Sequence, residues 1–307
     1  MTPAACLLHC NYSVRTAVWL LLLLLLTLAP AVGRAEPQVN AISQPAAKPS
    51  MWRDSWPTFS WPEGVATVSA GALTAVLALR QQPQQARWSG GILFDDAVRN
   101  AVRLDSAAGR QRARRVGDMT YYTAPLLPLI VDPLLVSLLA HGDGRAALNS
   151  ELVGLEAFSY AGMLSFVSTR ISVRERPDAT QCRREHPDGV GCERDTEAFW
   201  SGHTSIVAAS AGLVCASHQY MPLWGSPVAD ASACALAAAS ALVTSVSRLA
   251  ADRHYASDVI VGMGVGFGFG YAVPVLLHYT RKKSALTLAI EPETVGSGAT
   301  FTVAGVF

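Results

Sequence analysis

Residues 247–278 read SRLAADRHYASDVIVGMGVGFGFGYAVPVLLH, a polar turn followed by a long apolar run. The run begins at Asp258, is long enough for a helix, and is too rich in glycine and alanine for a strand. Gly262, Gly266 and Gly270 recur every four residues, so they share one helix face and predict the close approach of a second helix. These glycines do not fit the GxGxxG pattern and no strand precedes them, which argues against a dinucleotide-binding loop.

Five further apolar stretches precede this run and also have the length and composition of helices. They are Val65–Leu79, Met119–Ala140, Glu151–Thr169, His203–Gln219 and Ala231–Val246. A charged amphipathic segment, residues 94–115, lies between the first two and predicts a surface helix. The sequence therefore predicts an all-α fold, a six-helix bundle, over residues 63–282.

The composition supports a chain that is packed or embedded in lipid. Of the 307 residues, 50% are hydrophobic and 15% are charged, against about a quarter charged in an ordinary soluble domain. This excludes disorder for most of the chain. The 24 lysines and arginines are balanced by 23 aspartates and glutamates, which argues against a nucleic-acid partner. A membrane protein or a tightly packed helical protein is expected.

Both ends of the chain differ from the helical region. Residues 1–35 combine a basic start, a short apolar block and small residues before Glu36, which predicts a signal peptide cleaved after Ala35; the alternative is an uncleaved anchor helix. Residues 36–62, rich in proline, tryptophan, serine and glutamine, predict a linker that lies over the core. In the tail, residues 283–307, two alternating segments flank a Gly-Ser-Gly turn and predict a β-hairpin packed on the helices. One hairpin cannot close an outer-membrane barrel.

The cysteines indicate an oxidising compartment. Two lie in the leader, and an even number remains in the mature chain: Cys182, Cys192, Cys215 and Cys234. Cys182 and Cys192 bracket a polar loop and predict a local disulfide, while Cys215 and Cys234 lie on neighbouring predicted helices and are candidates for the second bridge. Neither a C-x-x-C pair nor a histidine at ligand spacing accompanies them, so a metal site is not expected.

Three polar clusters each lie at the end of an apolar stretch. They are Arg174-Glu175-Arg176-Pro177, Ser201-Gly202-His203, and the segment from Ser247 to Asp258. Because successive helices of a bundle alternate in direction, all three are expected at the same end. Taken singly, each has an ordinary explanation: a helix stop, an N-cap, and an i, i+4 surface pair.

Together, the clusters contain the parts of a phosphate site. Arg176 and Arg248 offer planar donor forks that suit phosphate oxygens. The hydroxyl of Ser201 and the backbone N–H of Gly202, at a helix N-terminus, add neutral donors and the positive end of a helix dipole.

The same clusters also contain candidates for nucleophilic catalysis. His254 and Asp258 lie at i, i+4, so we expect the carboxylate to hold one ring N–H and leave the other nitrogen free to attack. His203 is then available to protonate a departing oxygen. An anion cradle, an oriented nucleophile and a separate acid describe phosphoryl transfer through a phosphohistidine.

On these residues the chain resembles the type 2 phosphatidic acid phosphatases, which share a site with bacterial class A acid phosphatases and vanadium haloperoxidases. The third family motif, S-R-x5-H-x3-D, matches in full from Ser247 to Asp258. The second, P-S-G-H, matches with Trp200 in place of proline, and the first, K-x6-R-P, matches with Thr169 in place of lysine. Arg170 or Arg174 is expected to supply the missing charge.

The resemblance implies a helical fold and a metal-independent phosphatase without a cofactor, acting on a phosphorylated small molecule or a lipid phosphate. It implies that His254 is the nucleophile, Asp258 its orienter and His203 the general acid. Phosphate would bind to Arg176, Arg248, Ser201 and Gly202, with Arg170 in place of the lysine. The alternatives are a vanadate-dependent haloperoxidase and a protein that binds phosphate or lipid without turnover.

The location follows from an argument about topology. Integral members of the family have six membrane helices and an outward-facing site, which requires the first helix to start inside. A cleaved leader would leave that start outside. Val65–Leu79 is also short for a span, and the fourth and fifth stretches are only mildly hydrophobic. We therefore expect an exported, periplasmic or extracytoplasmic bundle that contacts a membrane surface.

Overall fold

The computed structural model describes residues 49–83, 85–186, 188, 192, 195–281, 286–292 and 299–305. The predicted signal peptide and the first part of the predicted linker lie outside these residues. In the remainder of the linker, Trp52 and Trp56 are buried with ring centroids 5.4 Å apart, and both contact Tyr279 near the end of the helical region. This part of the linker therefore packs on the helices.

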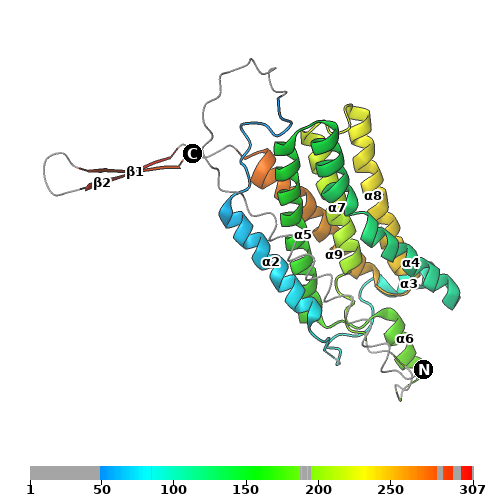
Figure 1. Ribbon diagram of the computed structural model, residues 1–307. Coiled ribbons are helices and arrows are strands. Elements are labelled where there is room, and N and C mark those ends of the chain that lie inside the picture. The colour runs from blue at the N-terminus through cyan, green and yellow to red at the C-terminus, as the bar shows by residue number, and fades with distance from the viewer. Residues whose placement is uncertain are drawn as a thin grey trace, which may run out of the picture. The chain divides into compact units, whose positions relative to one another are not determined.

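Helices make up the region from residue 61 to residue 279 (Figure 1). In chain order they are α2 (Trp61–Leu79), α3 (Asp95–Val102), α4 (Ala107–Thr123), the π-helix η1 (Leu127–Ala140), α5 (Gly144–Ser172), α6 (Pro177–Glu185), α7 (Gly202–Tyr220), α8 (Pro227–Ala250), α9 (Ala256–Val273) and the π-helix η2 (Pro274–Tyr279). The expectation of a helical fold is confirmed. The count of six stays a prediction, because shorter helices, α3 and α6, accompany the apolar ones and the second apolar stretch divides between α4 and η1.

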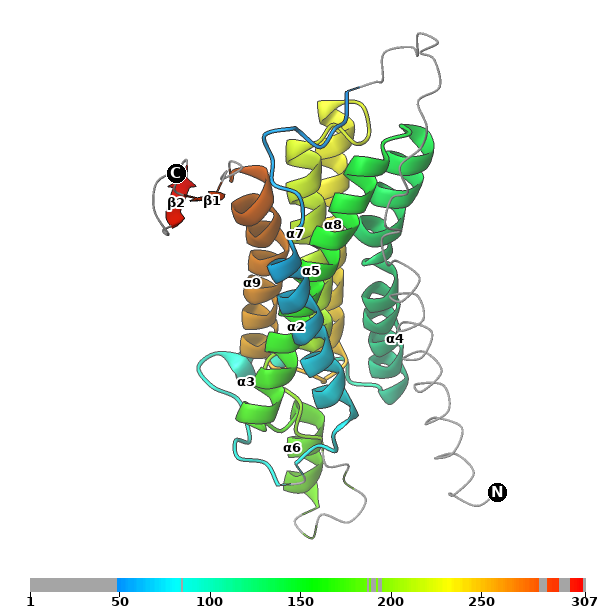
Figure 2. The ribbon, with the colours of Figure 1, turned by 60° about the vertical axis from the view of Figure 1, so that its left-hand side comes forward.

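The central helix is α7, which packs against α5, α8 and α9. Its small residues make this possible: Ala208, Ala209, Ala211 and Ala216 are all fully buried. Figures 1 and 2 show α2 lying along α5, and α4 packs along α8. The helices around α7 run in alternate directions, so the end of α5, the start of α7, the end of α8 and the start of α9 meet at one end of the bundle. Hydrogen bonds join these ends, including Ser201 N–H to the carbonyl of Asp258 at 3.1 Å, which confirms that the three polar clusters lie together.

The glycine face predicted for the last apolar run is where α9 meets α7. A Cβ atom built on Gly266 would lie 2.0 Å from the carbonyl oxygen of Ser205, and one on Gly270 would lie 2.0 Å from that of Ala209. Such contacts are far inside van der Waals separation. The prediction of close helix approach is therefore confirmed.

Replacing Gly266 with alanine is expected to lower the free energy of unfolding by about 3 kcal/mol, because the backbones of α7 and α9 must separate. The matched control is Gly264→Ala on the same helix, where a Cβ would meet nothing within 4 Å. There the better helix propensity of alanine is expected to raise stability by up to about 1 kcal/mol. Thermal unfolding of both variants in one detergent provides the comparison, and equal melting temperatures would contradict the close packing.

The outward faces of several helices are apolar. Val68 on α2, Leu139 on η1, Leu242 on α8 and Ile260 on α9 are each more than 50% exposed. Among the described helices, α2, α5, α8 and α9 with η2 are long and apolar enough to cross a membrane, and α4 with η1 passes the same test as a pair bent by 40°. The expectation that the first apolar stretch is too short is wrong, because α2 begins at Trp61 and is 19 residues long. The apolar helices thus indicate membrane association.

Two disulfides form within the described residues. Cys182 is joined to Cys192, and Cys215 on α7 is joined to Cys234 on α8. These are the pairings that the sequence suggested. Because disulfides persist in oxidising compartments, they suggest that the protein resides in one.

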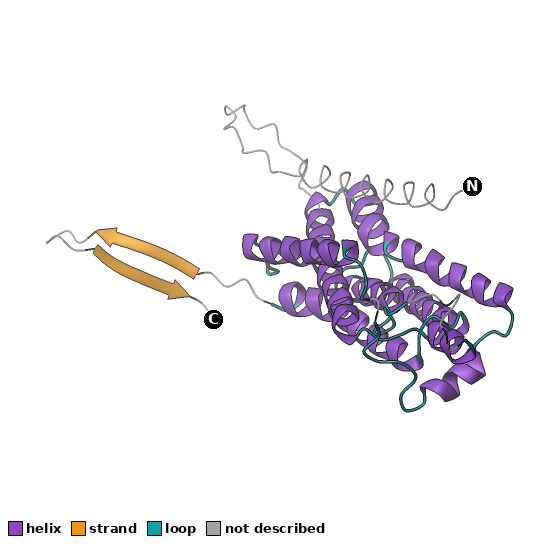
Figure 3. Cartoon of the chain, turned by 90° about the horizontal axis from the view of Figure 1, so that it is seen from below, coloured by secondary structure: helices purple, strands orange, loops and turns teal. Residues whose placement is uncertain are grey.

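The tail contains the described strands, β1 (Leu286–Pro292) and β2 (Ala299–Gly305) (Figure 3). They pair antiparallel, with Leu286 opposite Gly305 and Pro292 opposite Ala299. The packing of this hairpin on the helices stays a prediction.

Candidate active site

His254 lies between α8 and α9 and is 3% exposed. Its Nδ1 is 2.8 Å from the carbonyl oxygen of Ala198. Since a carbonyl oxygen can only accept, Nδ1 carries the proton and Nε2 of the neutral ring holds a free lone pair. Burial lowers the pKa of His254 well below 6.5, and the charges of Arg176 and Arg248 lower it further. The ring is therefore neutral at physiological pH, and Nε2 is its unprotonated nitrogen.

Asp258 differs from its predicted geometry. Its Oδ2 accepts the backbone N–H of Tyr255 at 2.8 Å and lies 3.8 Å from Nδ1 of His254, beyond hydrogen-bond distance. Its Oδ1 accepts from Arg174. Because Asp258 lies in the first turn of α9, its carboxylate caps that helix, and the carbonyl of Ala198 holds the ring N–H instead. Burial raises the pKa of Asp258 to about 7, against the charge of Arg174, and its carboxyl lies beside the imidazole without holding it.

His203 lies in the first turn of α7. Its Nε2 is 3.0 Å from Oδ1 of Asp118 on α4, and its ring packs on Tyr121 with centroids 4.5 Å apart. Burial and, after it, the charge of Arg248 lower the pKa of His203 to about 3, although Asp118 opposes both effects. Asp118 lies outside the three polar clusters, and its signal in the sequence is a lone acidic residue directly before an apolar stretch.

Two arginines supply positive charge beside these histidines. Arg176 pairs through Nε with Asp195 at 2.8 Å, and Arg248, 2% exposed, donates to Asp118 at 3.0 Å. Within the described part of the chain, Nε of Arg248 is buried without a hydrogen-bond partner. An anion with several acceptor oxygens would satisfy such a donor.

Ser201 and Gly202 form the start of α7. Ser201 is fully buried, and its Oγ accepts the backbone N–H of Thr204 at 3.4 Å, so it serves as the N-cap. The N-terminus of α7 points its free N–H groups toward the same end of the bundle as His254 and His203.

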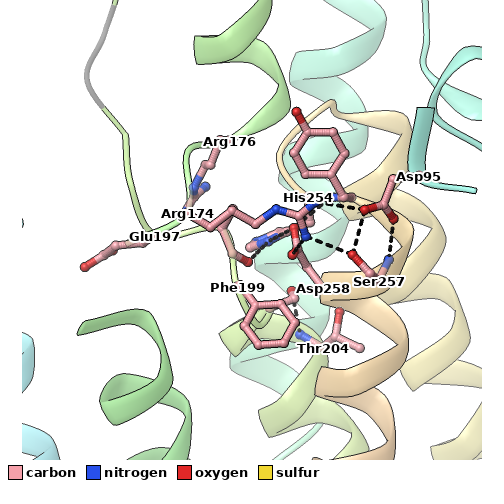
Figure 4. Close-up of polar contacts among 12 residues, drawn as sticks. Asp95, Arg174, Arg176, Glu197, Phe199, Thr204, His254, Ser257 and Asp258 are labelled. Carbon is pink, nitrogen blue, oxygen red and sulfur yellow. Dashed lines mark hydrogen bonds and ion pairs between the residues drawn. The ribbon is translucent and has the colours of Figure 1, made fainter. Parts of the chain in front are cut away.

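The two candidates for the missing lysine have other partners. Arg170 pairs with Glu197 at 3.3 Å and donates to the carbonyl oxygens of Leu77 on α2 and of Arg80, the residue that follows α2. Arg174 is fully buried beside Asp258. In Figure 4, the side chains of Arg174 and Arg176 leave the same loop in different directions. Neither Arg170 nor Arg174 lines the cavity described next.

A cavity of about 280 Å³ lies at this end of the bundle, and Arg248, Ser201 and Asp258 are not among the residues that line it. Its polar part is lined by Ser165, Thr169, Arg176, Glu197, Gly202, His203 and His254, and the remainder by Thr74, Tyr121, Phe158, Gly162, Phe166 and Ile206. The two histidines and Arg176 thus share one cavity, and an apolar wall continues from them along α5 and α7.

Comparison with known proteins agrees with this geometry. The family model of the PAP2 superfamily matches residues 152–282, the segment that holds all three polar clusters. Comparisons with curated proteins and with solved structures found no match. Members of the PAP2 superfamily are mostly phosphatases. The resemblance drawn from the motifs is therefore confirmed by the match of residues 152–282 to the PAP2 superfamily.

Proposed function

We propose that the protein is a metal-independent phosphatase that hydrolyses phosphomonoesters or lipid phosphates through a phosphohistidine. The observation that carries this proposal is the state of His254: a buried, neutral imidazole whose Nδ1–H is bound by Ala198, in a cavity shared with His203 and Arg176. A neutral ring with a fixed tautomer is what a nitrogen nucleophile needs.

The proposed reaction has two steps. Nε2 of His254 attacks phosphorus, a P–N bond forms, and the P–O bond to the leaving group breaks while His203 gives that oxygen a proton. His203, now neutral, then removes a proton from water, whose oxygen attacks phosphorus and breaks the P–N bond. Inorganic phosphate leaves and both histidines return to their starting states. Arg176, Arg248 and the N-terminus of α7 stabilise the charge on the equatorial oxygens in both steps.

The cavity wall favours lipid phosphates among the candidate substrates. The phosphate end is polar, whereas Phe158, Phe166 and Ile206 line the continuation. An acyl or prenyl chain attached to the phosphate would bury apolar surface there, at about 25 cal/mol per Å². We therefore expect a lower KM for a lipid phosphate than for a small phosphomonoester.

We also propose that the site faces an extracytoplasmic compartment. The disulfide between Cys182 and Cys192 lies on α6 and the loop after it, directly following Arg176 and Pro177. A disulfide at this end of the bundle supports an oxidising environment on the side of the site.

The test is inorganic phosphate released in EDTA by protein lacking residues 1–35, from p-nitrophenyl phosphate and from phosphatidic acid in mixed micelles. Release from both, faster for the lipid at low concentration, is expected. Folded protein that releases no phosphate would overturn the proposal. In that case, bromination with added vanadate would indicate a haloperoxidase, and phosphate binding without release would indicate a binding protein.

The pH dependence of kcat/KM should have its maximum below pH 6.5. The free enzyme needs neutral His254 and protonated His203, and burial lowers the pKa of both. The nucleophile therefore remains neutral in mild acid, while the general acid loses its proton as pH rises. Asp118→Asn removes the charge that raises the pKa of His203, so the alkaline decline should move to lower pH. Initial rates from pH 2.5 to pH 9 measure both effects; a maximum above pH 7.5, or an unchanged profile in Asp118→Asn, would contradict this assignment.

A further inference from the structure

We propose that Arg174, held by Asp95, is a positioning residue that fixes both partners of His254. The inference rests on the proposed function, since it concerns how the nucleophile of that reaction is held.

Arg174 lies at the centre of a buried ionic cluster. One nitrogen of its guanidinium donates to Oδ1 of Asp258 and to Oγ of Ser257 at 2.8 Å, and the other donates to Oδ2 of Asp95 at 2.8 Å. The side chains of Arg174, Asp95 and Asp258 are all fully buried. Figure 4 shows the guanidinium between the two carboxylates, with Ser257 closing the cluster below it.

Two aromatic rings hold the guanidinium plane. Its central carbon is 3.9 Å from the ring centroid of Trp88 and 4.2 Å from that of Tyr255. A planar cation stacked on rings suits arginine and not lysine. The side chain is therefore fixed in orientation as well as in position.

Arg174 reaches His254 by two routes. Its side chain holds Asp258, whose Oδ2 is 3.8 Å from Nδ1 of His254. Its backbone carbonyl accepts the N–H of Ala198 at 3.0 Å, and the carbonyl of Ala198 accepts the ring N–H at 2.8 Å. A shift of Arg174 would thus move both the carboxyl group beside the imidazole and the acceptor that sets its tautomer.

Asp95 is built to remain charged inside this cluster. Burial disfavours its carboxylate, but N–H donors of Ile92 and Ser257 together with Arg174 hold its pKa below the usual value. Its carboxylate pairs with the guanidinium on the side away from Asp258 and so keeps the buried side chain of Arg174 in its orientation. Because buried ion clusters are an inefficient source of stability, their cost fits a positioning role.

The experiment compares kcat and KM of Arg174→Met, Arg174→Lys and Asp95→Asn with those of the wild type, on p-nitrophenyl phosphate. The control is Arg99→Met. Arg99 lies on α3, as Asp95 does, and forms an ion pair of 2.6 Å with Asp252, in the turn between α8 and α9. This substitution breaks that pair without touching Asp258 or Ala198. Folding is followed by melting temperature.

We expect kcat to fall about 100-fold in Arg174→Met with KM within about threefold, because a misplaced nucleophile slows chemistry more than binding. Arg174→Lys should recover part of kcat, Asp95→Asn should lose about tenfold, and Arg99→Met should lower the melting temperature while keeping kcat. A folded Arg174→Met with wild-type kcat would overturn the inference. If that variant does not fold, wild-type kcat in Asp95→Asn would overturn it. Wild-type protein without activity would instead overturn the proposed function.

Discussion

Turnover is expected to fall by about 10⁴-fold or more when His254 is replaced by asparagine. The asparagine amide can still donate to the carbonyl of Ala198, so the buried contact that Nδ1 makes is preserved. What the variant loses is Nε2, the atom proposed to bond to phosphorus. The phosphate-binding groups alone leave a small residual rate, as in other enzymes stripped of their nucleophile.

The measurement is steady-state phosphate release together with trapping of the phosphoenzyme. Wild-type protein mixed with labelled substrate and quenched in base should retain label that acid removes, since phosphohistidine is stable in base and labile in acid. His254→Asn should retain none. The control is His141→Asn, a change of the same type at an exposed histidine after η1, where unchanged kinetics are expected. Label retained by His254→Asn would assign the nucleophile to another residue.

Replacing Thr169 with lysine is expected to raise kcat/KM by about 10- to 100-fold. Thr169 lines the polar part of the cavity with Arg176 and His203, and its hydroxyl donates to the carbonyl of Phe166. A lysine there would place an ammonium beside the phosphate, where the family pattern has one. A hydrogen bond to a charged group contributes about 1.5–3 kcal/mol, which gives the range.

The matched control for this variant is Ile171→Lys, which adds the same charge to the same helix at a side chain 66% exposed. Its kcat/KM should match the wild type. Inhibition by inorganic phosphate provides a second measurement, since Thr169→Lys should bind it more tightly. If both lysine variants have the kcat/KM of the wild type, the absence of the family lysine does not weaken phosphate binding at the wild-type site, and the prediction is wrong.

The residues that the motifs carry could be predicted because their positions depend on local spacing. Helix alternation was enough to place His203 and His254 at the same end of the bundle. The side-chain partners depend on tertiary packing, which spacing does not contain. Ala198 holds the imidazole through a backbone carbonyl, and any residue type would offer the same atom.

Arg170 illustrates the limit of sequence reasoning in another way. It lies one position beyond Thr169, so on a helix it points about 100° away from it. The carbonyl oxygens at the end of α2 and the carboxylate of Glu197 take up its guanidinium. The partners of Arg170 are therefore set by the placement of α2 beside α5. An apolar pattern predicts that a helix is buried, but it does not predict which neighbouring helix its last turn contacts.

The carboxylates of Asp95 and Asp118 come from α3 and α4, ahead of the segment that matches the family model. A fragment trimmed to residues 152–282 would retain each motif residue, yet Arg174 would lose Asp95 and His203 would lose Asp118. Trp88, which pairs in parallel with Arg174 through a β-bridge, would be lost as well. Expression fragments and chimeras of this protein therefore need to begin before Trp88. A chimera that exchanges the matched segment with that of a relative also needs to exchange the residues from Trp88 to Asp118.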